Sequence, residues 1–60
     1  MASVEQEALR LQAQTARDLA QRARRQAERV TDAEEQGRLL SQAEQLIDRA
    51  EQLEAKAVAL

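Results

Sequence analysis

The chain has 60 residues, a formal net charge of −2, and no cysteine, histidine, proline or aromatic residue. Without cysteine or histidine, it lacks the side chains that most often bind transition metals, form disulfides or act as a general base. No nucleophile–base pair, glycine-rich phosphate loop or calcium-loop spacing occurs in it. We therefore expect no enzyme, no cofactor and no metal site, and one small domain over residues 1–60.

The distribution of hydrophobic and charged residues excludes a membrane protein and favours paired helices. No apolar run approaches the roughly 20 residues that span a bilayer, and the N-terminus lacks the pattern of a signal peptide, so we expect a cytoplasmic protein that binds no membrane. Residues 1–30 carry six arginines and four acidic residues, whereas residues 31–60 carry three basic and seven acidic residues. Opposite net charges favour two helices that lie side by side.

The first predicted helix covers residues 3–30. Ser3 and Gln6 have the spacing of a capping box, and Glu5 suits the positive end of the helix dipole. Apolar residues then recur at alternating spacings of four and three, which places them on one side of a helix, where they form a seam that packs against a partner. These residues are Leu9, Ala13, Ala16, Ala20, Ala23, Ala27 and Val30.

The second predicted helix covers residues 33–59, and Thr31 and Asp32 both offer a capping side chain at its start. Its seam has the same spacing in a different phase: Leu39, Ala43, Leu46, Ala50, Leu53, Ala57 and Leu60. At about 100° per residue the two seams would face opposite sides of one continuous helix, so the chain is expected to turn between them. Two alternatives remain open: a break at Gly37 with a new cap at Ser41, and an unbroken helix through Gly37.

One register allows the seams of an antiparallel hairpin to pack on each other, with Ala20 facing Leu46 and Arg10 near Glu54. It places small side chains opposite large or small ones, so that the helices approach closely.

The turn sequence Asp32-Ala33-Glu34-Glu35-Gln36 resembles the turn of the Rop family of plasmid copy-number regulators. The family's core positions align with Leu9, Ala13, Ala16, Ala20, Ala23, Ala27 and Val30 in the first helix and with Ala33, Gln36, Leu40, Ala43, Ile47 and Ala50 in the second. The resemblance implies a tighter register than the one above, in which Ala20 faces Ala43 and Glu54 lies beside Leu9 at the end of the hairpin. It also implies that the hairpin dimerises into an antiparallel four-helix bundle. The family's RNA-contact face, which includes a phenylalanine, aligns here with Val4, Leu11, Thr15, Leu19 and Gln26.

Large apolar side chains beside the seam predict self-association. A chain of this size buries little surface alone, and an exposed apolar strip usually marks an interface. The predicted interface residues are Leu11, Leu19, Leu40 and Ile47. The first interpretation is therefore an all-α, non-enzymatic module for structural or protein–protein interaction, a homodimer of hairpins that could also dock a protein partner helix to helix.

The second interpretation is a Rop-like regulator that binds nucleic acid. It rests on the arginines of the first helix, since arginine binds phosphate through two parallel hydrogen bonds. The candidate contacts are Arg17, Arg22, Arg24, Arg25 and Arg29. The negative net charge and the absence of an aromatic residue to stack on a base weigh against it.

Overall fold

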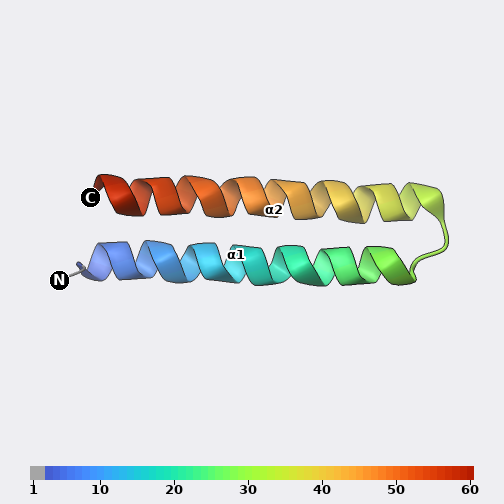
Figure 1. Ribbon diagram of the computed structural model, residues 1–60, viewed down its shortest axis with the longest axis horizontal. Helices are drawn as coiled ribbons and strands as arrows, with labels where there is room; N and C mark the ends of the chain where they lie inside the picture. Colours follow the sequence, from blue (N-terminus) through green and yellow to red (C-terminus); the bar gives the residue numbers. More distant parts are fainter. Residues whose placement is uncertain (1–2) are drawn as a thin grey trace.

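The computed structural model describes residues 3–60 and consists of two helices that lie side by side in opposite directions (Figure 1). Helix α1 spans Val4–Arg29 and helix α2 spans Ala33–Ala59, and residues 30–32 connect them. The predicted all-α antiparallel hairpin is confirmed. Met1 and Ala2, which belong to the predicted single domain, lie outside the described residues. Neither of the two described helices is long and apolar enough to cross a membrane.

Side-chain caps determine where both helices begin. The Ser3 hydroxyl accepts a hydrogen bond from the Gln6 backbone N–H, and the Gln6 side-chain oxygen accepts one from the Ser3 N–H, each at 3.0 Å. At α2 the cap is Asp32 rather than Thr31, because the Asp32 carboxylate accepts from the Glu35 N–H at 3.4 Å. Gly37 lies within α2 and has no positive φ, so the alternative of a break at Gly37 is wrong. The chain leaves the helix at residues 30–32, so the alternative of one unbroken helix is wrong as well.

The core between the helices consists almost entirely of alanine. Within residues 3–60, the buried side chains are Ala13, Ala16, Ala20, Ala23, Ala27, Ala43, Ala50, Leu53 and Ala57. Small side chains let two helix backbones approach closely, and Leu53 is the one larger side chain of the described part that is buried among them. No large side chain of the described part is fully buried.

Two glutamines join the helices at opposite ends of the hairpin. Gln6, in the first turn of α1, donates its side-chain N–H to the Ala57 carbonyl near the end of α2 at 2.9 Å. Gln36, in the first turn of α2, donates in the same way to the Ala27 carbonyl near the end of α1 at 2.9 Å. The last four carbonyls of a helix have no partner within it. Each helix therefore supplies a hydrogen-bond donor to the C-terminal turn of the other.

These end contacts belong to the tighter register, in which Ala27 faces Gln36. The mismatch expected there, Glu54 beside Leu9, is relieved because Leu53 is buried in the core cluster that Leu9 packs against. Glu54 is only partly buried and pairs with Arg17 instead of lying near Arg10. The predicted proximity of Arg10 and Glu54 belongs to the wider register and is replaced by this pair.

The hairpin is a thin rod that exposes much of its surface. Its extents are 47 × 14 × 9 Å and its radius of gyration is 14.0 Å, whereas a compact domain of this length has about 10 Å. Its accessible surface is 4807 Å², compared with about 3,900 Å² for a compact monomer of the same mass. Two helices alone therefore leave an unusually large area in contact with water.

Candidate interaction surface

A continuous groove runs along one side of the hairpin, between α1 and α2. Two adjoining hollows share Leu19 from α1 and Leu46 from α2. We call their union the Leu19–Leu46 groove. It is lined by Leu11, Gln12, Thr15, Ala16, Leu19, Arg22, Ala23, Arg25, Gln26 and Arg29 from α1 and by Gln42, Leu46 and Arg49 from α2.

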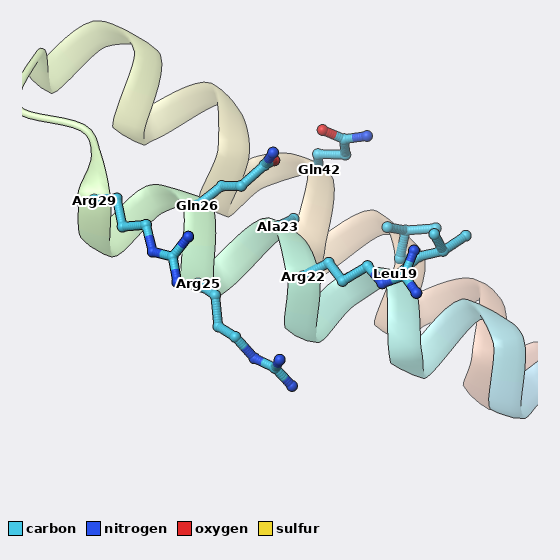
Figure 2. Close-up of a pocket in the computed structure, with 8 residues that line it drawn as sticks. Leu19, Arg22, Ala23, Arg25, Gln26, Arg29 and Gln42 are labelled. Atoms are coloured by element: carbon cyan, nitrogen blue, oxygen red, sulfur yellow. The ribbon is translucent and has the colours of Figure 1, made fainter.

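The floor of the groove is apolar and its rim is basic. Leu46 is half-buried and packs against the alanine cluster of the seam, whereas Leu19 is 43% exposed beside it. None of the described residues that line these two hollows is an aspartate or a glutamate, although Asp48 lines a neighbouring hollow that shares Gln42, Leu46 and Arg49 with them. Figure 2 shows arginines of α1 along one side and Gln42 of α2 on the other, with the Arg25 side chain directed away from α2. The groove therefore suits an apolar group that carries negative charge beside it.

The structure divides the four predicted interface residues between two sides of the molecule. Leu11 and Leu19 line the groove and are 70% and 43% exposed. Leu40 is 46% exposed and Ile47 packs at the margin of the core, but neither lines the groove. The two pairs therefore do not form one contiguous strip on a single hairpin.

Leu40 and Ile47 lie instead on the outer edge of α2. Leu40, Glu44, Ile47 and Glu51 are spaced four, three and four residues apart, which places them on one side of the helix. We call these four residues the α2 edge. At 3.6 residues per turn it points about 160° away from the α2 residues that line the groove. Both glutamates are exposed, so this edge carries apolar side chains with negative charge between them.

One ion pair joins α1 and α2 on the side of the hairpin away from the groove. The Arg17 guanidinium donates two hydrogen bonds to the Glu54 carboxylate, at 2.6 and 3.2 Å. This bond from Arg17 is the main reason why the pKa of Glu54 lies below its usual value, and Arg17 also attracts the carboxylate through its charge. The pKa of Arg17 is raised, first by the hydrogen bond with Glu54 and also by the charges of Glu54 and Glu51. Glu51 and the α2 edge therefore lie on the Arg17 side.

The structure separates the five arginines predicted as nucleic-acid contacts. Arg22, Arg25 and Arg29 line the groove together. Arg17 is occupied by Glu54, and Arg24 does not line the groove. Three of the five predicted residues are therefore brought together and two are not.

Sequence reasoning missed the α2 side of the groove, Gln42, Leu46 and Arg49. Leu46 does pack against the buried alanines of the seam, as its spacing predicts. Spacing alone does not show that the exposed part of the same side chain also lines the groove. Arg49 lies three residues after Leu46, which is the helical spacing that places it on the same side.

No set of three potential metal-ligating side chains converges anywhere within residues 3–60. Comparisons with family models, curated proteins and solved structures found nothing that matches this chain. The resemblance to the Rop family therefore rests on the turn and heptad residues alone.

The ion pair predicts a pH-dependent stability. Because the pKa of Glu54 is lower in the folded chain, the pair stabilises the fold above the unfolded-state pKa of Glu54, and this contribution is lost as the pH falls through the folded-state pKa. We expect Glu54→Gln to lower the melting temperature near neutral pH, and the difference from the parent chain to shrink as the pH falls through the folded-state pKa of Glu54.

Circular dichroism during heating, at a series of pH values, measures this difference. Glu28→Gln is the matched control, since Glu28 is exposed and makes no ion pair in the described part of the chain. A Glu54→Gln melting temperature equal to that of the parent at neutral pH would show that the pair contributes nothing.

Proposed function

We propose that this chain is a non-enzymatic module that binds helix to helix and associates with copies of itself. The observation that carries the proposal is the mismatch between its core and its surface. The core is built of alanines, while Leu11, Leu19, Leu40 and Leu60 are between 43% and 70% exposed. Burial of a leucine side chain contributes about 1.5–3 kcal/mol, so most of the apolar free energy available to this chain is gained only on association.

The shape of the hairpin supports the same proposal. A rod two helices wide exposes apolar surface along its length, and a second hairpin laid against it would give four helices around a common interior. Two hairpins arranged as a four-helix bundle are therefore the smallest assembly we propose. Docking of an unrelated protein helix would use the same surface.

Association is tested with a double variant, Leu19→Gln with Leu40→Gln, which removes one partly exposed leucine from each side of the hairpin. Glutamine has a helix propensity close to that of leucine, so helicity should be retained. We expect the parent chain to self-associate at micromolar concentration and the double variant to associate at least about tenfold more weakly, as the loss of about 1.4 kcal/mol or more would produce.

Sedimentation equilibrium over a range of concentrations measures both constants. Val4→Gln is the matched control, because Val4 is 83% exposed and lies outside the groove and the α2 edge. A parent chain that sediments as a folded monomer up to roughly 100 μM, about −5.5 kcal/mol on the affinity scale, would overturn the proposal.

A second candidate function is the binding of nucleic-acid phosphates in the groove. The observation that favours it is that Arg22, Arg25 and Arg29 line one hollow in which no described lining residue is acidic. Binding through phosphates weakens steeply with salt, and each lost contact reduces the slope by about 0.7–0.9. If this function holds, changing Arg22, Arg25 and Arg29 to glutamine should reduce the dependence of log K on log salt for structured RNA by about two. Fluorescence titration at several salt concentrations measures this slope. An unchanged slope, or no binding by the parent at low salt, would rule it out.

A further inference from the structure

The groove and the α2 edge are complementary in both polarity and charge. The groove has an apolar floor with Arg22 and Arg49 beside it. The α2 edge has two apolar side chains with Glu44 and Glu51 between and beyond them. These surfaces face roughly opposite sides of the same hairpin, so one copy cannot bring them together.

The spacing of the apolar residues also agrees. Leu40 and Ile47 are seven residues apart, which is about 10.5 Å along a helix, and Leu11 and Leu19 are eight residues apart, about 12 Å. Eight residues also turn a helix about 80° beyond two full turns, so Leu11, 70% exposed, lies farther from the seam than Leu19. A helix edge laid along the groove would therefore place one apolar side chain against Leu19 and the other on the side of the groove where Leu11 lies. Its glutamates would then lie within the rim of arginines.

We infer that the Leu19–Leu46 groove of one copy binds the α2 edge of a second copy. This inference rests on the self-association proposed above. The contact joins two unlike surfaces. It unites the four residues that the sequence predicts as an interface, with Leu11 and Leu19 supplied by one copy and Leu40 and Ile47 by the other.

Contact between two identical grooves is disfavoured by charge. Each groove presents arginines with no carboxylate among its described lining residues, and like charges brought together across an interface are destabilising. A contact between two α2 edges would bring Glu44 and Glu51 of both copies together, although Arg17 lies near Glu51 on that side. The combination of groove and edge places the groove arginines opposite these glutamates.

A contact between unlike surfaces has a structural consequence. Each two-copy assembly leaves one groove and one α2 edge free, so addition of further copies continues until a ring closes or a filament grows. The four-helix arrangement of two hairpins is then the first step of a series and not its end. We expect average mass to rise beyond that of a dimer with increasing concentration.

A complementation experiment tests the inference. Leu19→Gln damages the groove and leaves the α2 edge intact, whereas Leu40→Gln damages the α2 edge and leaves the groove intact. We expect each variant alone to associate at least tenfold more weakly than the parent. Mixed in equal amounts, the two should form a one-to-one heterodimer with close to the parent affinity that grows no further, because one intact groove and one intact edge remain.

Sedimentation of one variant carrying a fluorescent label identifies the mixed species. If the parent associates but Leu40→Gln does so equally well, the contact joins two grooves; if Leu19→Gln does so equally well, it joins two edges. Either result overturns the inference while leaving the proposed self-association in place. A monomeric parent overturns both.

Salt supplies an independent readout that does not depend on any variant. Raising the salt from about 50 to about 500 mM screens charges at the distances found across an interface. Attraction between groove and edge predicts weaker association at the higher salt. Stronger association would indicate that like-charged surfaces meet, and would contradict the inference. Changing Glu44 and Glu51 to lysine should lower the affinity of association. Added salt should then no longer lower it further.

Discussion

The alanine seam is the constraint on which the rest of this structure depends. Alanines at nearly every buried position bring the two helices close together. Of the seam leucines, Leu53 is buried in the core, whereas Leu9 and Leu46 pack against it and are only partly buried. A hairpin made in this way is well defined in geometry but buries little of its own apolar surface. The apolar surface that stays exposed can contribute free energy only when a partner covers it.

The same closeness determines what differs between the two sides of the hairpin. On one side Arg17 reaches across to Glu54, and at the two ends Gln6 and Gln36 reach carbonyls of the opposite helix. On the other side Leu19, Leu46 and the alanines between them line an open groove. One side thus has an ion pair between the helices and carries the α2 edge, whereas the other is open, apolar and basic. An asymmetry of this kind favours assembly through unlike surfaces over assembly through a shared one.

Most of the fold follows from the sequence, because hydrophobic spacing and capping residues act locally. The spacing of four and three, the capping box at Ser3 and the acidic start of α2 predict two helices with the observed bounds to within a residue. The side of the hairpin to which a residue belongs depends instead on the register, which two glutamine hydrogen bonds at distant ends help to set. Leu40 and Leu11 consequently seemed parts of one strip until the structure separated them. The role of Leu46 likewise depends on the volume of the alanines that face it.

Enlarging a seam residue is the most direct test of the central role of close packing. In the double variant Leu19→Gln with Leu40→Gln, where association does not contribute, Ala50→Leu should lower the free energy of unfolding by about 1–3 kcal/mol. The matched change Ala55→Leu, at an exposed position of the same helix, should alter it by no more than about 0.5 kcal/mol. Urea denaturation followed by circular dichroism measures both. An Ala50→Leu variant as stable as its background, or more stable, would mean that the helices separate readily to admit large side chains, and would contradict this account.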